Sequence, residues 1–124
     1  MSEPKPELKH VMPHFPVRDL KRSLAFYTES LGWDVKWKWP EDAPTHAGVT
    51  SGGVTIMLSQ SSGDRVVHAR SSVYIFVEAV DELHAELTAR VPHSVSGIGN
   101  TDYDMRDFNV TDPDGHHLSF GTCL

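Results

Sequence analysis

Cysteine is almost missing from this chain, because Cys123 is the only one among 124 residues. A single thiol cannot form an internal disulfide, so the sequence excludes a disulfide scaffold and favours a reducing compartment. Long apolar runs are absent as well, and none approaches the roughly 20 residues that a membrane helix needs. The first nine residues lack the apolar stretch of a secretory signal. We therefore expect a cytoplasmic protein that neither crosses nor binds a membrane.

Basic residues are also scarce, with 11 Lys and Arg against 17 Asp and Glu and a net charge of −6. No basic run is present, so we expect no nucleic acid partner. An acidic surface attracts cationic ligands, although a charge of this size is also ordinary for solubility. The length and the 39% apolar content predict a single globular domain spanning residues 1–124.

An internal repeat is present, because two similar patterns lie 60 residues apart. In each half a short apolar run, 11–17 or 72–77, precedes a segment with the apolar spacing of one helix face. The helix positions are Leu20, Leu24, Tyr27 and Leu31 in the first half and Val80, Leu83, Leu87 and Val91 in the second. Asp19 is a suitable N-cap for the first helix, and Gly32 suits its end.

Strand signals follow each helix. In the first half they are the alternating segment 33–39 and a hairpin, 47–59, that turns at Gly52 and Gly53. In the second half they are a weak segment, 94–98, and two strands, 105–111 and 117–121, that flank the turn 112–115. The sequence therefore predicts an α+β fold of two tandem βαβββ modules, 8–60 and 71–122, joined by a polar linker.

Strand alternation predicts which side chains face away from the helices. One helix covers only one face of a four-stranded sheet, and we expect the other face to curve into a cavity. The inward positions are Thr55, Met57, Ser59, Ser72, Tyr74, Phe76, Tyr103, Met105, Asp107 and Asn109. Trp33, Val35, Trp37 and Trp39 are expected on one face of their strand, with the last two at the groove mouth. Aromatic walls of this kind bind flat ligands by stacking and area burial.

Two segments carry a family resemblance. Residues 16–27 with Leu31-Gly32-Trp33, and residues 104–115 with Leu118-Ser119-Phe120, resemble the vicinal-oxygen-chelate superfamily of glyoxalases, dioxygenases and bleomycin-resistance proteins. Metal-dependent members of that family carry His, Glu or Gln at four cavity-facing points. The resemblance places Met12, Met57, Ser72 and Ser119 at those points. Thioethers and neutral hydroxyls are poor ligands for the usual divalent metals, so we expect neither metal nor cofactor.

Within that family the chain most resembles the bleomycin-resistance branch. The match rests on Trp37, on His46-Ala-Gly-Val49 and on the segment 103–108, where Asp104 stands in place of the usual glycine. The resemblance implies a homodimer that exchanges its opening strands and sequesters cationic, aromatic antibiotics without catalysis. The expected ligand-binding residues are His14, Trp37, Trp39, His46, Met57, Ser59, Tyr74, Phe76, Tyr103, Met105 and His117.

Other interpretations stay open at this point. The chain is alternatively a glyoxalase-like lyase or a dioxygenase whose metal site is displaced towards His14 and His117, or a structural dimer whose tryptophans are contact surface. Asp107 is either a general base or, more commonly for a lone acid on a strand, paired with Arg106 or Arg65. We expect the remaining histidines, His10, His68, His84, His93 and His116, to be solvated.

Overall fold

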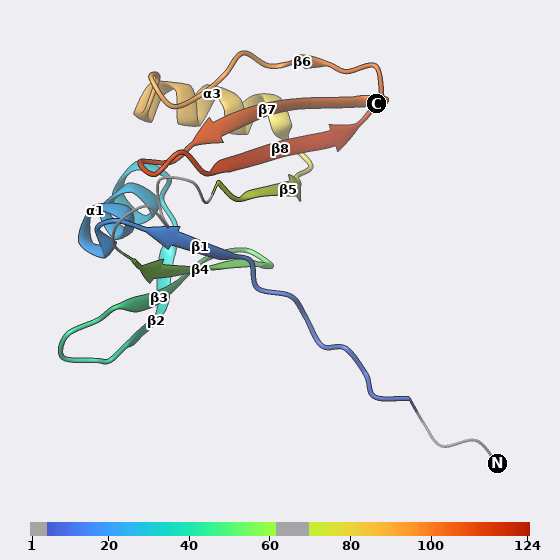
Figure 1. The fold of residues 1–124 in the computed structure, drawn as a ribbon. Coiled ribbons are helices and arrows are strands. Elements are labelled where there is room, and N and C mark those ends of the chain that lie inside the picture. Colours follow the sequence, from blue (N-terminus) through green and yellow to red (C-terminus); the bar gives the residue numbers. More distant parts are fainter. Residues whose placement is uncertain (1–4, 62–69) are drawn as a thin grey trace.

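Two four-stranded mixed sheets form the protein (Figure 1), and the computed structural model describes residues 5–61 and 70–124. The first sheet has the order β1-β4-β3-β2, with β1 (His14–Val17), β2 (Asp34–Trp39), β3 (His46–Ser51) and β4 (Val54–Gln60). The second has the order β5-β8-β7-β6, with β5 (Ser72–Phe76), β6 (Gly99–Asn100), β7 (Met105–Thr111) and β8 (His117–Cys123). In each sheet the strand that comes first in the chain pairs in parallel with the one that comes last, β1 with β4 and β5 with β8. The two predicted βαβββ units are confirmed.

The helices start where the sequence predicts. Asp19 accepts a hydrogen bond from the backbone N–H of Arg22 and so caps α1 (Leu20–Ala25). The helix then widens into a π-helical segment, η1 (Phe26–Ser30), before Gly32 adopts a positive φ of 79°. In the second unit α3 (Val80–Arg90) is a regular helix. Gly32 is therefore the left-handed residue that the sequence predicts after the first helix.

Each helix covers one face of its own sheet, and the core lies between them. The residues buried there alternate along the strands with exposed ones, as the period of two requires. They include Phe15, Val17, Val49, Ile56 and Leu58 in the first sheet and Ile75, Phe108, Val110, Leu118 and Phe120 in the second. In the part of the chain that the structure describes, no helix lies over the opposite face of either sheet.

Two strands differ from the prediction. A β-bulge at Lys36 shifts the register of β2, so Val35 pairs with Val49 whereas Trp37 pairs with Gly48. The expectation that the three tryptophans share one face was therefore wrong: Trp33 is buried in the core. The weak strand expected at 94–98 is only an isolated bridge at Val95, and the short β6 lies just after it.

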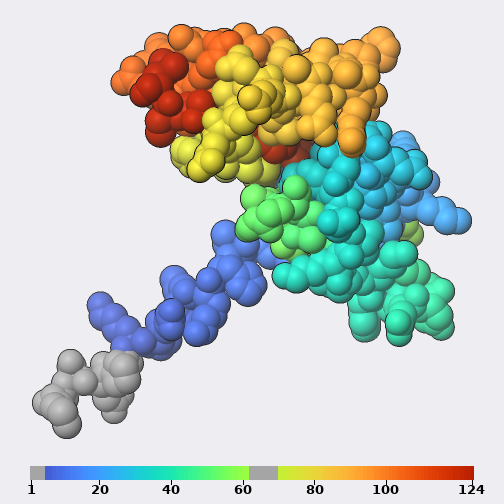
Figure 2. All heavy atoms as spheres, turned by 180° about the vertical axis from the view of Figure 1, so that it is seen from behind, coloured from blue at the N-terminus to red at the C-terminus, as the bar shows by residue number. Residues whose placement is uncertain are grey.

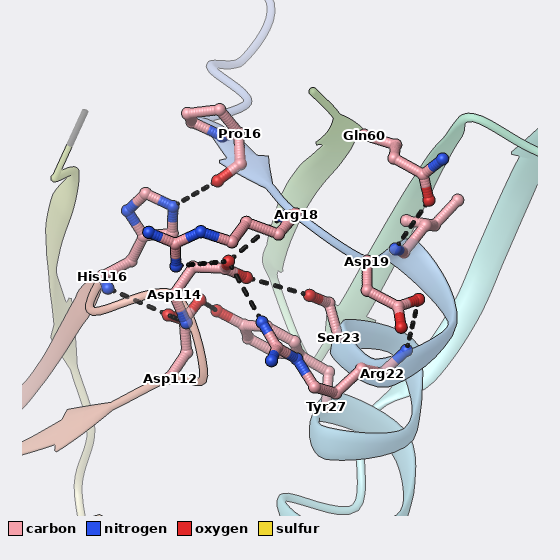
Figure 3. Close-up of polar contacts among 11 residues, drawn as sticks. Pro16, Arg18, Asp19, Arg22, Ser23, Tyr27, Gln60, Asp112, Asp114 and His116 are labelled. Carbon is pink, nitrogen blue, oxygen red and sulfur yellow. Dashed lines mark hydrogen bonds and ion pairs between the residues drawn. The ribbon is translucent and has the colours of Figure 1, made fainter. Parts of the chain in front are cut away.

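The turn between β7 and β8 docks onto the first unit (Figure 3). Asp114 is fully buried there and accepts hydrogen bonds from the backbone N–H of Arg18, the Arg22 guanidinium and the Ser23 hydroxyl, at 3.1, 3.3 and 3.3 Å. Asp112 accepts the hydroxyl of the buried Tyr27 at 3.0 Å. Two carboxylates from the second unit thus satisfy donors of the first, which couples the two sheets.

His116 completes this junction and corrects a prediction. Its ring is fully buried, with Nε2 2.6 Å from the carbonyl oxygen of Pro16 and Nδ1 2.9 Å from the backbone nitrogen of Ser71. The expectation that it is solvated was wrong, because the docked turn carries it between the units. His84 is half-buried against Phe108, whereas His10 and His93 are exposed and His68 lies outside the described residues.

An extended arm precedes β1. Residues 5–11 are exposed, and Figures 1 and 2 show the arm standing away from both units. Leu8 and Val11 keep 94% and 83% of their surface exposed. Among the residues that the structure describes, no helix combines the length and apolarity needed to cross a membrane.

The junction is testable through Asp114. Asp114→Ala leaves the buried Ser23 hydroxyl and two arginine groups without their acceptor, and we expect the free energy of unfolding to fall by about 2–4 kcal/mol. Asp42→Ala, at an exposed acid in the loop after β2, is the control and should change it by no more than about 0.5 kcal/mol. Urea denaturation followed by circular dichroism measures both. Equal losses in the two variants would contradict the assigned role.

Candidate ligand-binding faces

The uncovered face of the first sheet carries most of the predicted ligand residues of that unit. Strand register places them in two neighbouring rows, because directly paired residues point to the same side. One row is His14, Met57, Gly48 and Trp37, and the other is Pro16, Ser59, His46 and Trp39. The rings of Trp39 and His46 lie edge to face, with centroids 5.9 Å apart. The predicted ligand residues of the first unit therefore share one surface, although they come from four different strands.

Gly48 decides how Trp37 lies. A Cβ atom at Gly48 would clash with the indole nitrogen of Trp37, because the ring lies directly across β3. No other residue type leaves room for that close approach. Together with the bulge at Lys36, this glycine flattens the Trp37 ring onto the uncovered face and leaves it half-exposed.

The uncovered face of the second sheet is built in the same way. Its rows are Ser72, His117 and Thr111; Tyr74, Ser119 and Asn109; and Phe76, Gly121 and Asp107. A Cβ atom at Gly121 would clash with the Tyr74 hydroxyl, so the glycine allows Tyr74 to reach across β8. The hydroxyl donates to Asp107 at 2.9 Å. Each uncovered face therefore has a central glycine with an aromatic ring lying over it.

Among the described residues, the partners of Asp107 are tyrosines. Its Oδ2 atom accepts hydrogen bonds from Tyr74 and from Tyr103, the latter at 2.6 Å. Arg106 points to the opposite face and forms a double hydrogen bond with Asp81 of α3. The expected pairing of Asp107 with Arg106 was wrong, since adjacent strand residues face opposite ways, and Arg65 lies outside the described residues.

The carboxylate of Asp107 helps to raise the pKa values of both tyrosines. Desolvation, the hydrogen bond to Asp107 and the negative charge of Asp107 together raise the pKa of Tyr74 to about 12. The pKa of Tyr103 is also raised, mainly by its own hydrogen bond to Asp107. Burial raises the pKa of Tyr27 still more clearly, with Asp112 adding to the effect. Both hydroxyls on the uncovered face are therefore protonated donors at neutral pH.

A backbone feature supports the position of Tyr103. Asp104 adopts a positive φ of 62°. The bleomycin-resistance branch that the sequence resembles usually has glycine at this position. Tyr103 itself is 59% exposed, and Met105 is half-buried at the start of β7. The left-handed residue thus ends the loop before β7 and leaves the Tyr103 hydroxyl within reach of Asp107.

The two uncovered faces meet at a shallow groove of about 230 Å³. Its lining includes Val11 and Pro13 before β1, Thr55 from the first face, and Tyr74 and Phe76 from the second. Phe76 is 70% exposed, and its ring lies 5.2 Å from that of Tyr74. The predicted residues of the two units are thus brought to neighbouring surfaces rather than into one enclosed cavity within the described chain.

The four residues that the family resemblance assigns to metal-ligand positions have side chains that do not suit a divalent ion. Met12 and Met57 offer thioethers, Ser72 is an exposed hydroxyl, and the Ser119 hydroxyl donates to Asn109. His14 and His117 lie on different sheets. Among residues 5–61 and 70–124, no three His, Cys, Asp or Glu side chains gather closely enough to hold a metal.

A cleft of about 500 Å³ that the sequence did not predict lies between the units. It lies beside the short turn at Gly52 and Gly53, opposite α3, with Leu83 and Arg90 in its lining. The corresponding turn of the second unit, 112–116, is longer and fills its own junction with polar side chains. The unequal turn lengths, visible in the sequence, are the signal that points to this cleft.

Asp107→Asn is expected to lower the pKa of two tyrosines. It removes the charge that opposes ionisation of Tyr74 and Tyr103, so both should titrate at a lower pH than in the unmodified protein, while the buried Tyr27 keeps its raised value. Ultraviolet absorbance of tyrosinate against pH measures this. Asp42→Asn is the control of equal charge and should leave the curve unchanged. A curve that does not move in Asp107→Asn would contradict the hydrogen-bonded cluster.

Comparison with known proteins agrees with this architecture. A family model, the Glyoxalase/Bleomycin resistance protein/Dioxygenase superfamily, matches residues 7–120. The bleomycin resistance protein of Geobacillus stearothermophilus is 28% identical over 126 aligned positions, which cover 88% of this chain and 92% of that protein.

Two solved structures share the fold. The bleomycin-binding protein of Streptomyces verticillus, complexed with copper(II)-bleomycin, gives a TM-score of 0.79 at 21% identity, covering 97% of this chain and 99% of that one. A glyoxalase-related enzyme from Clostridium phytofermentans gives 0.78 at 16% identity, covering 98% and 100%. With the family model matching nearly the whole length and the paired βαβββ units in place, the chain belongs to the glyoxalase/bleomycin resistance protein/dioxygenase superfamily.

Proposed function

We propose that this protein binds and sequesters a bleomycin-type antibiotic or a similar aromatic small molecule, without metal-dependent catalysis. The observation that carries the proposal is the composition of the two uncovered faces. They present the rings of Trp37, Trp39, Tyr74, Phe76 and Tyr103, most of them exposed. Large aromatic surfaces of soluble proteins mark interaction sites, because exposing them to water is costly. Stacking and area burial would supply the affinity.

The chemistry of the family's metal positions supports binding over catalysis. Lyases and dioxygenases of this superfamily need His or carboxylate ligands, whereas this chain has two methionines and two serines at the corresponding points. The Geobacillus relative is named a bleomycin resistance protein, and the Streptomyces structure holds copper(II)-bleomycin. Both support a resistance role here. The glyoxalase-related neighbour shares only the fold. The single cysteine supports a cytoplasmic location.

A homodimer would complete the binding groove. In one chain the two faces form neighbouring open surfaces, and a second copy can cover them. The arm at residues 5–11 supports exchange of the opening segments, because Leu8 and Val11 contact little of their own chain. Exposed apolar side chains on an extended arm gain most by packing against another subunit.

Trp37→Ala tests the ligand face. We expect it to weaken binding of bleomycin about 10- to 100-fold, since one stacked aromatic ring contributes roughly 1.5–3 kcal/mol. Val35→Ala is the matched control, because Val35 lies on the same strand but shares the face of the buried Val49. Isothermal titration calorimetry with metal-free and copper-bound bleomycin measures both. If the unmodified protein releases no heat, bleomycin is not its ligand.

The dimer is tested by charging the arm. Leu8→Asp together with Val11→Asp should leave the fold intact, because both side chains are exposed within one chain, yet shift the protein from dimer to monomer. Size-exclusion chromatography with light scattering measures the mass, and Lys9→Asp is the control on the same arm. If the unmodified protein runs as a monomer at all concentrations, the proposed homodimer is contradicted.

A further inference from the structure

Asp107 stands out on the uncovered face of the second sheet as a carboxylate without a positively charged neighbour among the described residues. Its Oδ2 atom is held by the hydroxyls of Tyr74 and Tyr103. Within the same part of the chain, no hydrogen bond or ion pair reaches its Oδ1 atom. Arg106, the nearest basic residue in sequence, is engaged by Asp81 on the other side of the sheet. Within residues 5–61 and 70–124, one carboxylate oxygen is therefore left open to a ligand.

Aromatic rings border this open oxygen. Tyr74 and Phe76 lie on one side of Gly121, and Asp107 pairs with Gly121 on the other. Because Gly121 has no side chain, nothing on β8 stands between the rings and the carboxylate. Tyr103 adds a third ring that is 59% exposed. Aromatic faces attract cations through their negative π surface, and a carboxylate among them adds charge attraction and a hydrogen-bond acceptor.

We propose that Asp107, Tyr74 and Tyr103 form the subsite that binds the ammonium group of the ligand. This inference deepens the proposed function and rests on it for the identity of the full ligand. The two tyrosine hydroxyls fix the carboxylate in one orientation, so little side-chain freedom is lost when the cation binds. The first face also carries an acid, Asp34, in the row with Thr50 and Thr55, but among the described residues no tyrosine hydroxyl holds its carboxylate. The cation subsite is therefore placed on the second sheet, where the carboxylate is held between two tyrosines.

A matched pair of small probes tests the subsite without any antibiotic. Choline carries a quaternary ammonium group, and 3,3-dimethylbutan-1-ol is its neutral isostere. Nuclear magnetic resonance of ring-labelled tyrosines follows Tyr74, Tyr103 and Tyr27 in one titration. We expect choline to shift the first two saturably and to leave the junction residue Tyr27 unmoved, whereas the alcohol shifts none. No saturable choline shift in the unmodified protein overturns the inference.

Two variants distinguish a local contact of the ligand with Asp107 from a general effect of negative charge. Asp107→Asn should weaken choline binding about fivefold or more, the effect of losing about 1 kcal/mol of charge attraction. Asp102→Asn removes the same charge from the exposed loop before β7 and should leave binding within twofold of the unmodified protein. Equal losses in both variants overturn the inference. The unchanged signal of Tyr27 reports that Asp107→Asn is folded.

A comparison of bleomycin with bleomycinic acid tests this inference independently of the proposed function. Bleomycinic acid lacks the cationic terminal amine of bleomycin and carries a carboxylate in its place. In calorimetry the unmodified protein should prefer bleomycin, and Asp107→Asn should remove most of that preference while Asp102→Asn keeps it. Choline binding without bleomycin binding would refute the proposed ligand and leave the subsite standing. Bleomycin binding with an unaltered preference in Asp107→Asn would refute the subsite and leave the function standing.

Discussion

A four-stranded sheet covered by one helix can bury only one of its two faces, and this constraint shapes the whole molecule. The covered faces form the core from Phe15 and Ile56 in one unit and from Phe108 and Phe120 in the other. The uncovered faces stay in contact with solvent within one chain. Those faces carry exposed aromatic side chains, among them Trp39, Phe76 and Tyr103, and large exposed apolar surfaces are typical of interaction sites.

Both uncovered faces use the same local device to arrange their rings. Gly48 lies beneath Trp37, and Gly121 lies beneath the Tyr74 hydroxyl. A missing Cβ atom on a central strand lets a ring from the neighbouring strand lie flat across the sheet instead of standing upright. The outcome differs in polarity: the first face becomes an aromatic surface with histidine and methionine, and the second gains a carboxylate held between two tyrosines.

The two repeats are joined unequally. The longer turn, 112–116, places Asp112, Asp114 and His116 against the first helix and β1, and their hydrogen bonds satisfy the buried groups of both units. The short turn at Gly52 and Gly53 has no side chains with which to do the same, and a cleft remains beside α3. The docked turn is therefore one of the contacts that fix the two units relative to each other, together with the apolar core that they share.

The sequence alone determined the repeat, the α+β class and most strands, because periodic apolar spacing and turn residues are local properties. It also determined which residues occupy the uncovered faces, since strand alternation assigns each side chain to a face. Met57, Tyr74 and Asp107 were placed correctly on this basis, whereas the bulge in β2 breaks the alternation that grouped Trp37 with Trp33.

Tertiary structure decided what depends on contacts between distant segments. The bulge at Lys36 separates Trp33 from Trp37, and no sequence period reveals one extra residue in a strand. His116 is buried rather than solvated because its turn docks on the other unit, 100 residues away from Pro16. Asp107 binds two tyrosines rather than Arg106, because the glycine at 121 opens a path across β8. Such pairings are set by packing between strands, which the order of residues along the chain does not encode locally.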